Sequence, residues 1–184
     1  MNTPMQLSTF SVHFTAFIMF WNHCEMSGRQ ILQLLLGEGE PSMAIAAEIQ
    51  NRSLTQALKS IARSRKFEHL QAKLDHFCNG YDTLLGYRNY YIHALMGIDA
   101  GIGGLLGLSA KGKLQYSSDS LSPEQIEKIS QNFRDLVAYG ATIQRDLGAT
   151  GSGMLSLLDS YATSPETPQW PKTLEKRQRL IREG

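Results

Sequence analysis

The chain has 184 residues, of which 42% are hydrophobic, and a formal net charge of +1. This length and apolar content suffice for one domain with a sizeable core and leave little room for a second. The near-neutral charge excludes a global electrostatic attraction to nucleic acid, so any phosphate-binding site has to be local.

The first predicted element is a long helix in the aromatic-rich N-terminal region. Apolar and small residues alternate at spacings of four and three, which is typical of a helix packed in a bundle. These residues are Phe10, Phe14, Phe17, Trp21, Cys24, Gly28, Ile31 and Leu35. We expect the helix to end at Gly37. The run from Phe10 to Trp21 is too short to span a membrane and no Lys or Arg precedes Arg29, so we predict a cytoplasmic protein without membrane attachment.

The two cysteines, Cys24 and Cys78, lie on or beside apolar helical faces. They belong to no paired-ligand motif, and we interpret them as reduced core residues rather than a disulfide. The sequence predicts no metal site and no cofactor.

A second helix is predicted to begin at Ser42 as its N-cap. Its apolar side consists of Met43, Ala46, Ile49, Leu54, Ala57, Leu58 and Ile61. The helix leads into the basic run of Lys59, Arg63, Arg65 and Lys66. Such a run is usually a solvated face, but Arg63, Arg65 and Lys66 are also the candidate RNA-backbone contacts in the first half of the chain.

The third predicted helix repeats the four-three spacing. Its apolar seam consists of Leu70, Leu74, Phe77, Tyr81, Leu84, Arg88, Tyr91 and Leu95. Arg88 is the exception, because an arginine is rarely buried without a partner and a purely structural seam would normally hold Leu or Met there. Asn89 and His93 are one turn apart on nearly the same face, whereas Arg88 lies roughly 140° from His93. We interpret His69 and His76 on this helix as surface residues.

The chemistry of these three side chains suits phosphodiester cleavage without a metal. A guanidinium offers a planar fork to phosphate, an imidazole transfers protons near neutral pH, and an amide can orient either group. One straight helix cannot wrap Arg88 and His93 around a single atom. They can grip an extended anion from two sides or act with the same groups on a second helix.

Arg88-Asn89, three intervening residues and His93, late in a long helix of a helical chain, resemble the R-N-x-x-x-H motif of the HEPN superfamily. Its members are helical-bundle proteins, many of them endoribonucleases of toxin, phage-defence and RNA-processing systems. The resemblance implies a homodimer whose motif helices face each other and form a shared RNA-cleaving site. It implies that His93 assists attack by the ribose 2′-hydroxyl, that Arg88 holds the phosphate and that Asn89 positions His93 or substrate. RNA, a second copy and an antitoxin protein are the partners that it suggests.

Two alternatives stay open. The chain could be a catalytically inactive HEPN-like dimeric bundle that binds a nucleotide or a protein partner, or an unrelated bundle in which Glu25 or Asp82 pairs with Arg88. Glu25 itself lies one turn from Arg29, which favours an intrahelical ion pair. The alternative role for Glu25 is to contact Arg88 or His93 and orient its side chain toward the substrate.

Glycines accumulate after Leu95 and are expected to end the third helix. Leu106 and Leu108 before Ala110-Lys111-Gly112-Lys113, and Leu114 and Tyr116 after it, alternate as in a small two-stranded hairpin. Lys111 and Lys113 at its tip are candidate phosphate contacts, although such lysines more often keep a sheet edge soluble.

Ser122-Pro123-Glu124-Gln125 is a strong helix start. The stripe of this fourth helix consists of Ile126, Ile129, Phe133, Leu136, Gly140, Ile143 and Leu147. A short helix over Met154–Leu158 is predicted next, followed by an arm with Pro165, Pro168 and Pro171 that ends in the basic segment Lys172 to Arg182. The arm could wrap a partner subunit or stay loose.

The sequence therefore predicts an all-α fold, a bundle of four main long helices with a small β-hairpin between the third and fourth and an irregular C-terminal arm. Residues 1–150 form the helical bundle domain, with residues 97–118 as the glycine-rich hairpin insertion. Residues 151–184 hold the short helix and the Pro-rich basic arm.

Overall fold

The computed structural model describes residues 7–37, 39–93, 95–99, 102–110, 114–120, 123–149 and 167–172. At residues 7–11, 65, 93, 123 and in the strands it describes the backbone only. The helices are α1 (Leu7–Leu36), α2 (Glu40–Glu48), α3 (Asn51–Ala62), α4 (Gln71–His93) and α5 (Pro123–Asp146), with a 3-10 helix, η1 (Arg65–Leu70), before α4. The strands are β1 (Leu95–Asp99), β2 (Ile102–Ala110) and β3 (Leu114–Ser120). The fold is mostly helical, as predicted.

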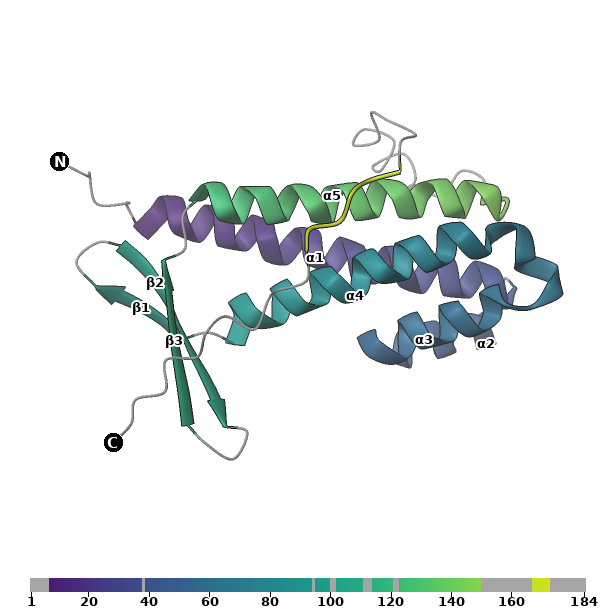
Figure 1. The fold of residues 1–184 in the computed structure, drawn as a ribbon. Helices are drawn as coiled ribbons and strands as arrows, with labels where there is room; N and C mark the ends of the chain where they lie inside the picture. Colours follow the sequence, from purple (N-terminus) through teal and green to yellow (C-terminus); the bar gives the residue numbers. More distant parts are fainter. Residues whose placement is uncertain are drawn as a thin grey trace.

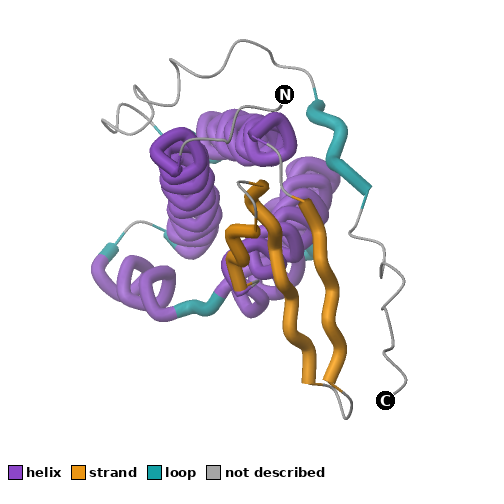
Figure 2. The backbone as a smooth tube through the Cα atoms, turned by 90° about the vertical axis from the view of Figure 1, so that its left-hand side faces the viewer, coloured by secondary structure: helices purple, strands orange, loops and turns teal. Residues whose placement is uncertain are grey.

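Three long helices form the body of the molecule. α1 packs along α5, and α4 packs against α5 (Figure 1). α3 packs against α1 and α4 at the end where α4 begins, and α2 packs against α1 there. The sheet lies at the opposite end, beside the end of α4 (Figures 1 and 2). The molecule therefore has a helical end and a sheet end, and Arg88 belongs to the second.

The three predicted seams form the core. The buried members are Phe17, Trp21, Cys24, Ile31 and Leu35 of α1, Leu70 of η1, Leu74, Phe77, Tyr81 and Leu84 of α4, and Ile126, Ile129, Phe133, Leu136 and Ile143 of α5. α1 ends at Leu36, and Gly37 follows with a positive φ of 93°, which confirms the predicted stop. The lack of a side chain at Gly28 lets α3 approach α1, because a Cβ there would lie 2.9 Å from Leu54 Cδ2.

The prediction of one helix beginning at Ser42 is wrong. The segment forms two helices, α2 and α3, separated by extended backbone at Ile49 and Gln50. α2 begins at Glu40, and the Ser42 hydroxyl donates to the Gly39 carbonyl oxygen (2.8 Å) from inside the first turn. The break has a geometric cause: the step from Ile49 to Leu54 is five residues, which turns the apolar side by about 140°. One straight helix could not bury both halves.

The glycine-rich region forms a three-stranded antiparallel sheet in the order β1-β2-β3. The two strands predicted around the Ala110–Lys113 turn correspond to β2 and β3, with Leu108 opposite Tyr116 and Ala110 opposite Leu114. β1 departs from the prediction: the four-three seam continues through Leu95, whereas α4 ends at His93 and Leu95 pairs with Leu106 in the sheet. Short strands paired through glycines give little alternation from which a sequence could reveal them.

The C-terminal arm contributes one described segment, Thr167–Lys172, which is extended and lies against α4 of the same chain. His76 is therefore not a plain surface residue, since it stacks on Trp170 with ring centroids 5.0 Å apart. The predicted helix at Met154–Leu158 and the basic segment after Lys172 lie outside the described residues.

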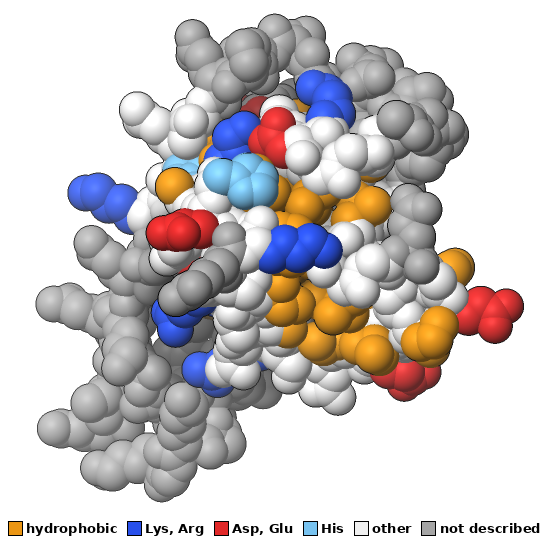
Figure 3. All heavy atoms as spheres, turned by 90° about the vertical axis from the view of Figure 1, so that its right-hand side faces the viewer, with side chains coloured by type: hydrophobic (Ala, Val, Ile, Leu, Met, Phe, Trp, Pro, Cys, Tyr) orange, Lys and Arg blue, Asp and Glu red, His pale blue; other side chains and the backbone are white. Residues whose placement is uncertain are grey.

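α2 turns most of its apolar side chains outward. Only Ser42 and Ala46 are buried in it, whereas Met43 and Ile45 are more than half exposed and Leu36 is exposed at the neighbouring end of α1. Figure 3 views the molecule from the helical end and shows hydrophobic side chains gathered on that face. Among the described helices, none combines the length and the apolar character that crossing a bilayer requires.

Candidate functional site

The seam of α4 leaves the core shortly before Arg88. Leu74, Phe77, Tyr81 and Leu84 are each 0% exposed, whereas Arg88 and Tyr91 are only partly buried. The exception in the apolar pattern thus lies where the helix emerges from the bundle. A guanidinium there keeps access to water or to an anion, which removes most of the cost of placing it on the seam.

Arg88 is held by its neighbour. Its Nη1 donates to Oδ1 of Asn89 across 3.0 Å. Its Nε is buried and has no hydrogen-bond partner among the described atoms. Within the described part of the chain, Arg88 forms no ion pair with a carboxylate. The guanidinium is therefore oriented by an amide while its charge is not neutralised by a described acid, which leaves donors for an anion.

His93 is the last residue of α4. The helix is continuous from Arg88 to His93, so the predicted backbone relation holds: Asn89 and His93 are one turn apart and Arg88 is on a different face. The His93 side chain lies outside the described residues. The described side chains bring together Arg88 and Asn89, and the place of the imidazole stays a prediction.

The two acids proposed as partners of Arg88 are engaged elsewhere. Glu25 Oε1 accepts hydrogen bonds of 2.6 Å from Trp21 Nε1 and from Asn51 Nδ2. Glu25 Oε2 lies 3.9 Å from Nη1 of Arg29, as the intrahelical ion-pair interpretation predicts.

Asp82 accepts a hydrogen bond from Thr55 Oγ1 (2.8 Å) and pairs with Lys59 Nζ (3.2 Å). These contacts join α1, α3 and α4 and give both carboxylates structural roles. No described contact links either acid to the motif.

Aromatic rings fix the motif end of α4. Tyr91 meets Phe17 of α1 edge-on at 5.7 Å, and Tyr87 stacks on Tyr91 at 6.5 Å. Phe17 also contacts Phe133 of α5 at 5.0 Å. The three long helices thus meet one turn from Arg88, which gives the site a rigid base.

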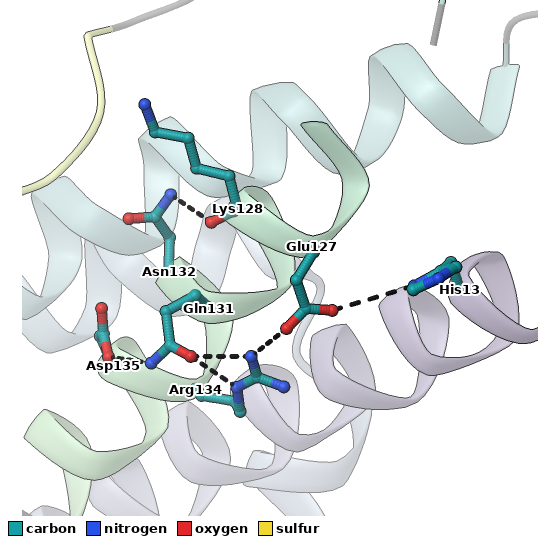
Figure 4. Close-up of polar contacts among 7 residues, drawn as sticks. All are labelled: His13, Glu127, Lys128, Gln131, Asn132, Arg134 and Asp135. Carbon is teal, nitrogen blue, oxygen red and sulfur yellow. Dashed lines mark hydrogen bonds and ion pairs between the residues drawn. The ribbon is translucent and has the colours of Figure 1, made fainter. Parts of the chain in front are cut away.

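A second polar cluster lies between α1 and α5 at this end of the bundle (Figure 4). Glu127 pairs with Arg134 and lies 3.9 Å from His13 Nδ1. Arg134 also donates to Gln131 and covers the ring of Phe20 at 4.9 Å. Because its charge is paired and its face is stacked, Arg134 is poorly placed to bind a phosphate.

The predicted RNA-binding cations are not gathered at the motif. Arg63 and Lys66 are exposed but precede α4, whereas Arg88 is near its end. With a rise of 1.5 Å per residue, the 18 residues from Leu70 to Arg88 span about 27 Å. The Arg65 side chain and both hairpin-tip lysines, Lys111 and Lys113, lie outside the described residues.

The cysteines supply no second reactive centre. Burial raises the pKa of the Cys24 thiol well above its ordinary value and raises that of Cys78 to about 12. Both thiols are buried and unpaired with each other. A thiol held protonated is a poor nucleophile and metal ligand. The described residues contain no cluster of three or more His, Cys, Asp or Glu that could hold a metal ion.

The sequence interpretation missed the contact between Thr167–Lys172 and α4. Its partners are more than 80 residues apart, so no local pattern reveals the pairing. A signal did exist on α4, where His76, Gly80, Thr83 and Tyr87 form a second stripe at the four-three spacing beside the main seam.

Comparison with protein-family models, with curated proteins and with solved structures gave no match for this chain.

Proposed function

We propose that this protein is a HEPN-like, metal-independent endoribonuclease that cleaves single-stranded RNA with Arg88, Asn89 and His93. The observation that carries the proposal is the state of Arg88. It lies on an apolar seam, is oriented by Asn89, and forms no ion pair with any described acid. A purely structural arginine in such a place would be expected to pair with a carboxylate.

The chemistry assigned to these residues is transesterification followed by strand release. His93 accepts the proton of the ribose 2′-hydroxyl, and the 2′-oxygen forms a bond to the adjacent phosphorus. The bond from phosphorus to the 5′-oxygen breaks, and that oxygen takes up a proton. The products are a 2′,3′-cyclic phosphate and a 5′-hydroxyl end. Arg88 stabilises the charge that develops on the phosphoryl oxygens, and Asn89 keeps the guanidinium oriented.

The proposal includes a symmetric homodimer. Because Arg88 and His93 lie on different faces of α4, one helix presents part of a site to any single phosphate. Two copies of α4 that meet near Arg88–His93 would line one cleft with two arginines and two histidines. In this arrangement the apolar seam of α4 packs in the core of its own chain as far as Leu84, and the seam residues after Leu84 lie in the subunit interface.

The test is cleavage of a labelled single-stranded RNA in excess EDTA. His93→Ala should lower the rate about a hundredfold or more, the usual contribution of a general base. His69→Ala is the matched control, because His69 is exposed at the opposite end of the bundle. This variant should cleave RNA at the wild-type rate. Activity that disappears with chelator, or a His93→Ala variant with the wild-type rate, would contradict the proposal.

One observation favours the alternative of a catalytically inactive bundle that binds a nucleotide or protein partner. The described cations Arg63 and Lys66 precede α4, whereas Arg88 lies about 27 Å along the helix from Leu70, so they are not gathered into an RNA groove at the motif. Under this alternative, neither wild type nor His93→Ala cleaves RNA, and wild type binds a nucleotide or protein partner at Arg88.

A further inference from the structure

The helix α2 presents its larger apolar side chains to solvent. Its buried residues are Ser42 and Ala46, which are one turn apart, whereas Met43 and Ile45 are more than half exposed. A helix that serves only the core of its own chain does the reverse, because it buries its large apolar side chains and exposes polar ones. α2 is therefore attached to the other helices through small residues, and its apolar side is left for a partner.

Helical geometry gives the exposed side of α2 a definite order. At 100° per residue, Met43 and Ile45 lie on the two flanks of the helix, and Ala44 lies midway between them on the outward side. Ala47 is three residues after Ala44 and lies beside it. Both alanines are exposed. A strip of small side chains between two larger apolar ones suits the close approach of a second helix with an apolar face.

Acidic residues stand at both ends of this surface. Glu40 begins α2 and Glu48 ends it, and both are exposed. Within the described part of the chain, neither forms an ion pair. Residues 30–51 contain three Glu and no Lys or Arg. Figure 3, which views this end of the molecule, shows a hydrophobic area with acidic side chains along one edge. The surface, here called the α2 face, consists of Glu40, Met43, Ala44, Ile45, Ala47 and Glu48.

We propose that the α2 face binds an amphipathic helix of a partner protein, one that carries a basic residue at each end of a row of apolar side chains. The two acids are eight residues apart, a rise of about 12 Å. Basic residues seven or eight positions apart on the partner helix span nearly the same distance. Leucines between them would contact Ala44 and Ala47, and Met43 and Ile45 would cover their sides. The α2 face lies at the opposite end of the bundle from Arg88, so this interaction is separate from the proposed nuclease site.

Charge selects this occupant over a second copy of the chain. In a symmetric pair of α2 faces, antiparallel helices bring Glu40 to Glu48 of the other copy, and parallel helices bring each acid to its own equivalent. Either arrangement sets like charges against each other. A membrane surface with anionic lipids repels the same two acids. A basic partner helix instead places an opposite charge at each end.

The experiment uses the full-length protein and two synthetic helical peptides. Both peptides carry a row of leucines on one face; the first has Lys at both ends of the row and the second has Glu there. Fluorescence anisotropy of the labelled peptides gives their affinities. The Lys peptide should bind about tenfold or more tightly than the Glu peptide, and this preference should shrink as salt is added.

Substitutions on the exposed side of α2 locate the binding. Met43→Ser and Ile45→Ser should each weaken binding of the Lys peptide by about tenfold, because each removes a large apolar contact. The double variant Glu40→Gln, Glu48→Gln should lose the preference for Lys over Glu. Met19→Ser is the matched control, since Met19 is an exposed methionine of α1 outside the α2 face. This variant should bind both peptides as wild type does.

Several results would overturn the proposal. These are equal affinity of wild type for the two peptides, no affinity for either, and binding that no substitution on the α2 face weakens. A wild-type dimer that dissociates in Met43→Ser would show that a second copy covers the surface. Partition into phosphatidylcholine vesicles that is lost in Met43→Ser would show that a lipid surface covers it. None of these results bears on RNA cleavage, which the comparison with His93→Ala tests separately.

Discussion

The closest helix packing depends on glycines. Gly140 of α5 lies where three helices meet, because a Cβ there would overlap Ser27 Oγ of α1 and lie 3.0 Å from Cε2 of Phe77 of α4. Ser27 is itself fixed, since it is buried and accepts a hydrogen bond from Gln144 (3.2 Å). The position has no room for a methyl group.

We expect Gly140→Ala to destabilise the protein by about 1–3 kcal/mol, since overpacking outweighs the gain in helix propensity. Gly86→Ala, which adds a methyl group in open space, should instead stabilise it by roughly 0.5–1 kcal/mol. Urea unfolding of both variants measures the difference. Equal stabilities would mean that α1 and α5 do not pack closely at Gly140.

Burial of Cys78 makes the stability of the protein sensitive to alkaline pH. Burial raises the pKa of Cys78 from its ordinary value of 9.0 to about 12. Because the raised pKa belongs to the folded state, the neutral thiol contributes stability fully below pH 9 and loses it as the pH rises toward about 12. The free energy of unfolding should therefore fall more steeply over this range in wild type than in Cys78→Ala. Parallel pH profiles for the two proteins would refute the assignment.

A small polar network attaches α3 to the other helices. Asn51, at the start of α3, donates to Glu25 of α1 (2.6 Å) and accepts from the Tyr81 hydroxyl of α4 (2.8 Å). Tyr81 is fully buried. One amide thus satisfies groups on two other helices.

Asn51→Ala should cost about 1–3 kcal/mol of stability, because it leaves a buried hydroxyl and a half-buried carboxylate each short of a partner. The adjacent exposed Arg52→Ala should change the stability by less than about 0.5 kcal/mol. Thermal or urea unfolding compares the two. At a temperature where Asn51→Ala is folded, it should cleave RNA at the wild-type rate, because Glu25 has a structural role. A loss of cleavage in the folded variant would instead support the alternative that Glu25 orients Arg88 or His93.

The proposed site requires two chains. Light scattering over a dilution series should show a dimer that dissociates, and RNA cleavage per chain should fall with the dimer fraction. The exposed apolar side of α2 lies at the other end of the bundle, so Met43→Ser should leave both curves unchanged. A fully active monomer would contradict the composite site, and a dimer broken by Met43→Ser would place the interface on α2.

The spacing of apolar residues along the chain was enough to predict the helical core. Helical periodicity is a local property, so the seams through Trp21, Tyr81 and Phe133 follow from spacing alone, and burial to within a few per cent confirms them. The same spacing singled out Arg88 as an anomaly. Apolar spacing gave a wrong prediction at Ile49, where a five-residue step between apolar positions marks a break between two helices. It was also wrong at Leu95, which belongs to the short strand β1 that pairs with β2 partly through glycines.

The partners of the polar groups could not be predicted and follow from how the helices pack against one another. Glu25 pairs with Asn51, Asp82 with Lys59, and His76 with Trp170 across 94 residues of chain. These pairings depend on which helix faces come together, and a hydrogen bond between distant segments leaves no periodic trace in either one. The same holds for Gly80, whose purpose becomes visible only with the indole of Trp170 against it.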